Sequence, residues 1–311
     1  MDKKRIVIAL GGNALGKTLH EQMAAIRKTS RYIVALINEG HEVVLTHGNG
    51  PQVGLVMDVF DSYKLNHDID AFPMSVCVSI TQGYIGYDLQ NVMREEILNQ
   101  NLHVPVSTVI TQVVVDPDDP AFAEPTKPIG LFVSKEFAER ETQRGLSFAG
   151  FGEKGYRQVV ASPKPQHIVE WETIKTLLEA GQLVIACGGG GIPVKRMGNH
   201  LKGMQAVVDK DLSSALLAGL IHADYLVILT AVEKVALNYG KENEKLLDKM
   251  NVEQARQYIG EGHFGKGSML PKVEAAIQAA TQNPDCKTLI TSIEKLAEGF
   301  KGLTGTLIEF N

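Results

Sequence analysis

Lysines and aspartates that could stabilise a transferring phosphoryl group occur in three separate stretches of the sequence. In Asp209-Lys210-Asp211, two carboxylates bracket an ammonium group directly before a helical pattern. Lys127 has prolines close by on both sides, which stiffen its backbone. Residues 262–272 join a glycine turn to a helix start and end on Lys272. In phosphoryl transfer the donor, the acceptor and the transferring group are all anionic, so catalysis depends on positioning and on cations.

Two or three lysines would supply the stabilisation that such a reaction needs. At about 4 Å and an effective dielectric of about 20, one cation stabilises one unit of negative charge by roughly 4 kcal/mol. A carboxylate among the lysines would hold the ammonium groups in place. Each stretch also has a purely structural interpretation, because acidic residues suit the first turn of a helix and a lysine near prolines can belong to a rigid turn. Asp209-Lys210-Asp211 taken alone favours the structural interpretation.

Four glycine-rich turns follow apolar segments and are candidate anion-binding turns. They are Gly11-Gly12-Asn13, Gly48-Asn49-Gly50, residues 188–191 and Gly265-Lys266-Gly267. Glycine lets backbone N–H groups approach an anion closely, and ligands of α/β folds bind at the carboxyl ends of strands. One such turn alone can equally be a tight connection. The first two are favoured as binding turns because each also carries an asparagine, whose side chain adds a donor.

Residues 11–18 read Gly-Gly-Asn-Ala-Leu-Gly-Lys-Thr and match the Walker A pattern after a strand. Read alone, this match predicts a P-loop nucleotide hydrolase with Lys17 on the β- and γ-phosphates. The sequence offers no convincing Walker B aspartate at the end of a later apolar strand, since residues 225–229 are followed by Thr230. The P-loop protein therefore stays as an alternative.

Short segments that are apolar on both faces predict the central strands of a mainly parallel sheet. These segments are residues 6–10, 43–45, 183–187, 225–229 and 288–290. Helical patterns lie between them, at residues 22–39, 168–180, 212–220 and 269–280. Such alternation predicts one α/β domain over residues 1–311, built as a three-layer α/β/α sandwich.

Residues 116–165 interrupt this alternation with many prolines and glycines, with strand candidates at 113–115 and 159–160. The segment is predicted to leave the sheet as a lid subdomain, because long excursions of compact domains are usually functional. We expect it to be mobile without ligand and to close over the phosphoryl path, carrying Lys127 inward. An ordinary surface insertion is the alternative.

Charge and composition limit the partners that are expected. The 311 residues carry 31 Lys and Arg against 36 Asp and Glu, a formal net charge of −5, which argues against nucleic acid. No apolar segment approaches the roughly 18 residues that cross a bilayer, and the first residues do not form a signal peptide. Cys77, Cys187 and Cys286 are far apart in apolar segments, which suits buried thiols. We therefore expect a cytoplasmic protein without membrane or nucleic-acid partners.

The motifs taken together, and in this order, resemble those of the carbamate kinases in the amino acid kinase family. The resemblance covers essentially the whole chain. It rests on residues 9–15 (Ala-Leu-Gly-Gly-Asn-Ala-Leu), 46–54 (Thr-His-Gly-Asn-Gly-Pro-Gln-Val-Gly), 81–87 (Thr-Gln-Gly-Tyr-Ile-Gly-Tyr), 125–130 (Pro-Thr-Lys-Pro-Ile-Gly), 162–165 (Ser-Pro-Lys-Pro), 187–193 (Cys-Gly-Gly-Gly-Gly-Ile-Pro), 209–211 and 262–272. Each piece is common, while the combination is specific. The resemblance also weakens the Walker A match, because residues 16–18 lie where the family varies in length and sequence.

This resemblance implies the amino-acid-kinase fold, a homodimer, ATP or ADP with Mg²⁺, and a place in arginine metabolism. The implied reaction is reversible phosphoryl transfer between ATP and carbamate, which gives ADP and carbamoyl phosphate. The substrate lobe would span residues 1–182, with the lid at 116–165, and the nucleotide lobe would span residues 183–311. Because an acyl phosphate is a stronger phosphoryl donor than ATP, the working direction is expected to be ATP synthesis.

By the same resemblance, the functional residues fall into three groups, and none is a metal ligand. The phosphoryl path has three cations and one organising aspartate, namely Lys127, Lys210, Lys272 and Asp211. Substrate and phosphate are bound by Gly11, Gly12, Asn13, Gly48, Asn49 and Gly50. The nucleotide is bound by Thr230, Tyr239, Gly267 and Met269. Carbamate is already an anion, so no general base is needed, and the sequence offers no candidate base.

Three departures from the family pattern are visible. Leu131-Phe132 stands where the family often has Pro-Phe, Gly265-Lys266 stands where Ala-Pro is common, and residues 74–78 also differ. No departure removes a proposed catalytic group, but the lid and residues 74–78 are expected to shape the substrate pocket. Two alternatives therefore stay open. One is a kinase of the same fold for another small carboxylate or carbamoyl compound, and the other is a P-loop or non-catalytic nucleotide-binding protein.

Overall fold

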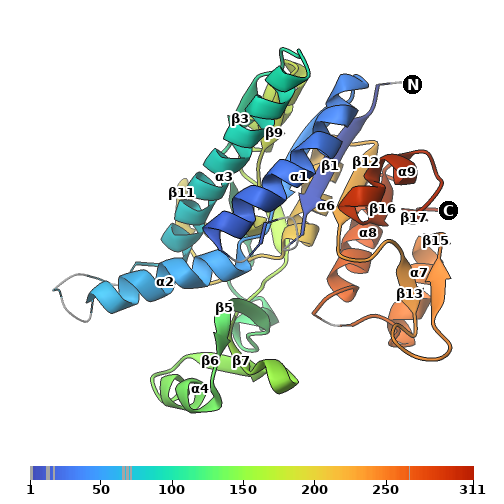
Figure 1. Ribbon diagram of the computed structural model, residues 1–311. Coiled ribbons are helices and arrows are strands. Elements are labelled where there is room, and N and C mark those ends of the chain that lie inside the picture. Colours follow the sequence, from blue (N-terminus) through green and yellow to red (C-terminus); the bar gives the residue numbers. More distant parts are fainter. Residues whose placement is uncertain are drawn as a thin grey trace.

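An eight-stranded sheet forms the centre of the molecule, in the order β15-β17-β16-β12-β1-β2-β9-β3 (Figure 1). This computed structural model describes residues 3–311 except 12–14, 17, 65–66, 68–69, 71 and 266. The strands are β1 (Arg5–Leu10), β2 (Glu42–His47), β3 (Val106–Thr108), β9 (Leu183–Ile185), β12 (Tyr225–Leu229), β15 (Lys249–Asn251), β16 (Lys287–Thr291) and β17 (Thr306–Glu309). Neighbouring strands pair in parallel except β16 with β17, which confirms the predicted α/β class and mainly parallel sheet.

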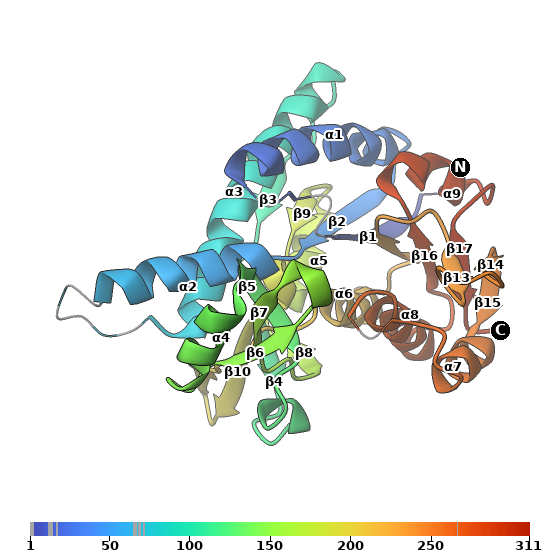
Figure 2. The same cartoon turned by 60° about the horizontal axis from the view of Figure 1, so that its bottom comes forward.

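Helices cover both faces of this sheet and create three layers (Figure 2). In β1, Ile6, Ile8 and Leu10 face one apolar core while Val7 and Ala9 face the other, and all five are fully buried. The first core is completed by α1 (Leu19–Asn38), α3 (Met74–Asn99) and α9 (Leu296–Phe300). The second is completed by α5 (Trp171–Glu179), α6 (Lys210–Leu220), α7 (Val252–Gly260) and α8 (Leu270–Gln282). The predicted α/β/α sandwich is therefore confirmed.

The segment 116–165, which keeps the name lid from the sequence prediction, has a sheet of its own and projects from the main body (Figures 1 and 2). Its elements are η2 (Pro120–Phe122), β5 (Lys127–Val133), α4 (Lys135–Thr142), β6 (Ser147–Gly150), η3 (Gly152–Lys154) and β7 (Tyr156–Val160). The sheet order is β5-β7-β6. Helix α2 (Gly50–Lys64), which starts at the turn after β2, packs against β5. The lid is thus attached close to one of the glycine turns.

A second sheet, in the order β11-β10-β4-β8, lies at the root of the lid. It consists of β4 (Gln112–Val115), which leads into the lid, β8 (Pro165–Ile168), which leaves it, β10 (Ile192–Met197) and β11 (His200–Gly203). The remaining elements are the hairpin β13 (Val235–Leu237) and β14 (Lys245–Leu247), with the short turns η4 (Gly188–Gly190) and η5 (Ile293–Lys295). Across the described part of the chain, none of the helices combines the length and apolar character that crossing a membrane requires.

One predicted helix begins later than expected, and five α-helices of the described chain are absent from the prediction, namely α2, α3, α4, α7 and α9. The helix predicted over 168–180 starts at Trp171, because residues Pro165–Ile168 form β8 and pair with β4 instead. The longest of these unpredicted helices are α2 and α3. Helix α3 buries Thr81, Gln82 and Gly86 beside its apolar residues, so its sequence lacks the continuous apolar stripe that identifies an amphipathic helix.

Candidate active site

The turns that follow β1 and β9 lie against the ends of neighbouring strands at the carboxyl edge of the central sheet. A Cβ atom on Gly11 would lie 2.6 Å from the carbonyl oxygen of Leu229, the last residue of β12. A Cβ atom on Gly188 would lie 2.5 Å from Nε2 of His47, the last residue of β2. Both distances are too short for a side chain, so glycine is required for the backbone to approach this closely. The prediction is therefore confirmed for the turns that follow β1, β2 and β9, and it is wrong for the fourth, because Gly265 and Gly267 lie between helices α7 and α8.

Asn49 holds the turn after β2 against α3 and the turn after β9. Its buried side chain donates through Nδ2 to the hydroxyl oxygen of Thr81 at 2.8 Å. Gly189 has a φ of +64°, and a Cβ atom there would lie 2.2 Å from the same Nδ2. The turn is thereby fixed with its first residue, Gly48, beside the aliphatic part of Lys210, whose Cδ would be 3.5 Å from a Cβ on Gly48.

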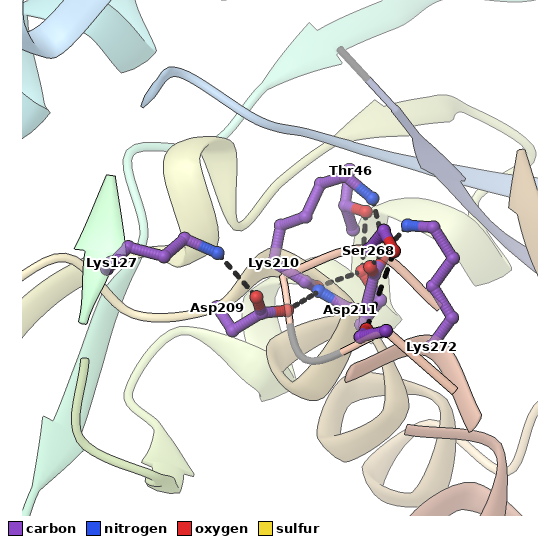
Figure 3. A network of polar contacts seen from close by, with 9 residues as sticks. Thr46, Lys127, Asp209, Lys210, Asp211, Ser268 and Lys272 are labelled. Atoms are coloured by element: carbon purple, nitrogen blue, oxygen red, sulfur yellow. Dashed lines mark hydrogen bonds and ion pairs between the residues drawn. The ribbon is translucent and has the colours of Figure 1, made fainter. Parts of the chain in front are cut away.

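Five charged side chains gather beside these turns and are called the phosphoryl cluster (Figure 3): Lys127, Asp209, Lys210, Asp211 and Lys272. Asp211 forms ion pairs with two lysines, with Lys210 and, at 2.8 Å, with Lys272. Asp209 forms an ion pair with Lys127. Lys127 and Asp209 are 82 residues apart in sequence, and Asp211 and Lys272 are 61 apart, so only the fold brings the five together.

Two helix starts position most of the cluster. Asp209 is the N-cap of α6, and its side chain accepts a hydrogen bond from the backbone N–H of Asp211 at 2.8 Å. Lys272 lies in the first turn of α8, directly after a proline. Proline is tolerated there because the first N–H groups of a helix have no hydrogen-bond partner within the helix. Because α6 packs against α8, the two first turns bring Asp211 and Lys272 together.

Buried hydroxyl groups fix the first turn of α6 to the sheet. Ser214 donates to the carbonyl oxygen of Lys210 at 2.6 Å, and the Thr46 hydroxyl at the end of β2 lies 2.6 Å from the Ser214 hydroxyl. Ser213 donates to the carbonyl oxygen of Gly190 at 2.6 Å. The helix that carries Lys210 is therefore hydrogen-bonded to β2, the strand before one glycine turn, and to the glycine turn that follows β9.

Burial opposes charge on Asp211, and the neighbouring lysines overcome it. The residue is 4% exposed, and burial alone would raise the pKa of its carboxyl group. Lys210 and Lys272 nevertheless hold this pKa well below its usual range. Burial lowers the pKa of the Lys210 ammonium; Asp211 opposes this shift, and the charge of Lys272 adds to it. Asp211 is therefore an ionised carboxylate that keeps two ammonium groups at a fixed separation.

His47 lies beside the cluster without adding charge to it. Burial lowers its pKa to about 4; a hydrogen bond to Gly48 opposes the shift, and Lys210 adds to it. Nδ1 lies 3.0 Å from the carbonyl oxygen of Gly48. Since a carbonyl can only accept, Nδ1 carries the proton of the neutral ring. The imidazole therefore shapes the turn at Gly48 and is a poor proton acceptor at neutral pH.

A cavity of about 450 Å³ lies next to the cluster, between the end of β12 and the start of α8, and is called the nucleotide cavity after the ligand that the sequence resemblance implies for it. Its walls include three residues expected to bind nucleotide, Thr230, Tyr239 and Met269. Gly267 is not among the lining residues, although its neighbours Gly265 and Ser268 are. Met269 of the cavity wall is also the N-cap residue of α8, whose first turn carries Lys272. A ligand that fills this cavity would therefore extend towards the phosphoryl cluster.

The structure brings together all four residues expected on the phosphoryl path and adds one. Lys127, Lys210, Asp211 and Lys272 share the cluster, whereas Gly12, Asn13 and the Walker-type Lys17 lie outside the described residues. Asp209 was not expected as a separate site residue. The available sequence signal was its place beside Lys210, but its partner Lys127 is too distant in sequence for a local pattern to reveal.

This arrangement suits the stabilisation of an anion that moves between two other anions. Three ammonium groups lie between glycine turns, which offer backbone N–H donors, and a cavity of nucleotide size. Both carboxylates of the cluster are engaged by lysines. In the described part of the chain, no group of three or more His, Cys, Asp or Glu side chains is placed to hold a metal ion.

Comparison with known proteins agrees with this chemistry. The profile of the amino acid kinase family matches residues 4–292. The chain is 56% identical to the carbamate kinase-like protein YqeA of Escherichia coli and 48% identical to the carbamate kinase of Staphylococcus haemolyticus. Each alignment spans 306 residues, 98% of this chain and 99% of the relative. Carbamate kinase from Giardia lamblia bound to AMP-PNP superposes with a TM-score of 0.89, at 36% identity and with 99% of both chains covered. The Giardia enzyme thiocarbamoylated by disulfiram on a cysteine gives 0.86 and 36% over the same shares.

Proposed function

The chain belongs to the amino acid kinase family, and from this premise we propose that it is a carbamate kinase, which transfers a phosphoryl group reversibly between ATP and carbamate. The observation that carries the proposal is Asp211 between Lys210 and Lys272, buried next to the nucleotide cavity. A buried carboxylate that arranges two cations has little value for stability alone, since the cost of taking the charges out of water offsets much of their mutual attraction. It does suit the binding of a transferring phosphoryl group.

In the proposed reaction, an oxygen atom of carbamate attacks the γ-phosphorus of ATP, and the bond from that phosphorus to the bridging oxygen of ADP breaks. Lys127, Lys210 and Lys272 would neutralise the charge that is spread over the transferring group, and Asp211 would keep Lys210 and Lys272 in register. No proton has to be removed from carbamate, which agrees with the low pKa of His47 and with the paired state of both cluster carboxylates.

The nucleotide cavity would hold the base and ribose of ATP or ADP, with Thr230, Tyr239 and Met269 in its walls. The residues fit a Mg²⁺ ion that arrives on the nucleotide phosphates, because this ion is commonly held by substrate phosphates and water rather than by a protein cage. Bound in this way, the ion would add positive charge at the phosphate oxygens. The chain's own lysines would then act on the transferring group, and the backbone of Gly11 and Gly48 to Gly50 on the substrate.

Exposed apolar side chains on α2 and α3 support the further proposal of a homodimer. Leu55, Val59 and Tyr63 follow one another at helical spacing on α2, and Val76, Ile80 and Tyr87 do so on α3, each at least 36% exposed. A net charge of −5 supports small molecules rather than nucleic acid as partners. A cytoplasmic location, a role in arginine metabolism and ATP synthesis as the working direction complete the proposal and rest on the resemblance to carbamate kinases.

A coupled assay of ATP formation tests the proposed function. Purified protein is given ADP and Mg²⁺ with carbamoyl phosphate or, in parallel, with acetyl phosphate, and ATP is measured with hexokinase and glucose-6-phosphate dehydrogenase. We expect rapid ATP formation with carbamoyl phosphate and at least a hundredfold less with acetyl phosphate. Preference for acetyl phosphate, or for another acyl phosphate in a wider panel, would favour a kinase of the same fold with another substrate. Binding of ADP without any turnover would contradict an enzyme of this class.

A further inference from the structure

Asp209 uses its two carboxylate oxygens on two different elements of the molecule (Figure 3). Oδ1 accepts the hydrogen bond from the backbone N–H of Asp211 that caps α6. Oδ2 pairs with the ammonium group of Lys127, the first residue of β5 in the lid. The side chains are only 13% and 28% exposed, so the pair is largely shielded from solvent. One side chain therefore joins the lid to the helix that carries Lys210 and Asp211.

The base of the lid is also joined to the main body by an apolar cluster that contains Ile129 and Val160, and by one close approach of backbone alone. A Cβ atom on Gly54 of α2 would lie 2.2 Å from Cα of Gly130 in β5. Gly130 has a φ of +65°, and Arg157 donates to its carbonyl oxygen at 2.8 Å. This contact fixes a point of β5 three residues beyond Lys127 but does not fix the Lys127 side chain. Among the described residues, the Lys127–Asp209 pair is the ion pair that links β5, β6, β7 or α4 to the main body.

In place of the lid that the sequence led us to expect to be mobile without ligand, we propose that Asp209 is a positioning residue that latches the lid and holds Lys127 over the phosphoryl path before substrate arrives. An ammonium group has three N–H donors, so Lys127 can keep Asp209 and still donate to a phosphoryl oxygen. Ordering of a long side chain is then completed in the free protein rather than at the moment of binding. The effect on substrate rests on the proposed function, whereas the latch itself is a property of the protein without ligand.

Asp209→Asn separates the latch from the helix cap, because asparagine caps helices as well as aspartate but carries no charge. In the protein without ligand, we expect faster amide hydrogen exchange across β5 in this variant, with unchanged exchange in α6. If the closed lid falls to about a tenth of the population, the KM for carbamoyl phosphate rises about tenfold. The KM for ADP should stay within about twofold, and Asp209→Glu should restore part of the effect because it returns the charge.

Two matched variants show whether the effect passes through the ion pair. Lys127→Met breaks the pair from the other side and leaves the cap intact, so it should accelerate exchange in β5 as Asp209→Asn does. Adding Asp209→Asn to Lys127→Met should then accelerate it no further. Glu139→Gln removes the exposed Lys135–Glu139 pair within the lid, 64% and 63% exposed, and should change neither exchange nor KM.

Exchange is measured without substrate, so its result does not depend on the kinase activity. The latch can be contradicted while the protein is an active carbamate kinase, and it can be supported even if the protein has another activity. Faster exchange in β5 for both single variants, without a further increase in the double variant, supports the latch. Unchanged exchange in β5 for Asp209→Asn and Lys127→Met would overturn it. So would an equal acceleration by Asp209→Asn with and without Lys127, because the effect would then act through α6 and not through the lid.

Discussion

The phosphoryl cluster and the nucleotide cavity lie side by side at one edge of the sheet, yet they are built from different kinds of residue. The cluster consists of five charged side chains, and its central carboxylate is 4% exposed. The cavity is lined by many residues, with Tyr239 at 68% exposure on its wall. Where function is concentrated in a few buried charges, each one is hard to replace. Where it is spread over a surface, each contact matters less.

The largest effect that tests this contrast is expected from Asp211→Asn. The change keeps the shape of the side chain but removes the negative charge that attracts both Lys210 and Lys272. The two ammonium groups then repel each other without compensation and move apart. A displacement of about 1 Å at a reacting centre can cost roughly a hundredfold in rate, and we expect at least this loss in kcat. Circular dichroism and thermal unfolding establish that the variant is folded. Near-normal turnover in a folded variant would show that catalysis does not need the charge of Asp211.

A pH profile tests the cluster without truncating any side chain. Burial holds the pKa of Lys210 below its ordinary value of 10.5, so this lysine loses its proton at a lower pH than an exposed lysine does. We expect kcat/KM to fall tenfold per unit above this pKa, with the alkaline limb starting below pH 10.5. Lys210→Arg should move the limb to higher pH, because arginine keeps its proton. A limb at the same pH in both proteins would assign it to another group.

The nucleotide cavity should tolerate what the cluster does not. Tyr239→Ala removes an aromatic ring that is mostly exposed, so only the part of the ring that covers the nucleotide is lost. The KM for ADP should rise by about threefold, since partial loss of one apolar contact is worth less than about 1 kcal/mol. The kcat with saturating ADP should stay within about twofold. A loss of kcat comparable to that of Asp211→Asn would end the contrast between the two regions.

The smallest effect is expected from thiol reagents. Cys77, Cys187 and Cys286 are all fully buried, as the sequence predicted, and burial raises the pKa of each thiol, that of Cys286 to about 12. Thiolates are the reactive form, so these thiols are protected twice. Disulfiram, which thiocarbamoylates a cysteine of the Giardia lamblia enzyme, should leave both the activity and the intact mass of this protein unchanged. Time-dependent inactivation with an added thiocarbamoyl mass would contradict this expectation.

The central strands could be predicted from the sequence because they are buried on both faces, which leaves uninterrupted apolar segments such as Val43 to Leu45 in β2. Helix α3 could not, because Gln82 is among its buried residues and is satisfied only by distant groups. Its Nε2 donates to the carbonyl oxygens of Thr111 and Gly188. A buried glutamine has no local signature, since its partners belong to other parts of the chain. The same holds for the helix expected at 168, where pairing with β4 overrides the local pattern.

The site likewise has one part that local sequence reveals and another part that it does not. Glycine turns at strand ends could be recognised from local sequence because they follow apolar segments directly. The assembly of Lys127, Lys210 and Lys272 was expected only from the resemblance to a family, because no local pattern relates residues so far apart. Asp209 was overlooked because a carboxylate before a helix already has a sufficient role as a cap. Its second role became visible with the position of Lys127.

Paired substitutions of Lys17 and Lys210 test the central claim most directly, because the two lysines belong to competing accounts of the site. A P-loop protein needs Lys17 on the phosphates, whereas the phosphoryl cluster needs Lys210. We expect Lys210→Ala to lower kcat in the coupled assay by about a thousandfold or more, because one cation at the phosphoryl group is worth several kcal/mol. Lys17→Ala should stay within about twofold, as single charges outside a site usually contribute less than about 0.5 kcal/mol. An inactive Lys17→Ala protein beside a fully active Lys210→Ala protein would contradict the account.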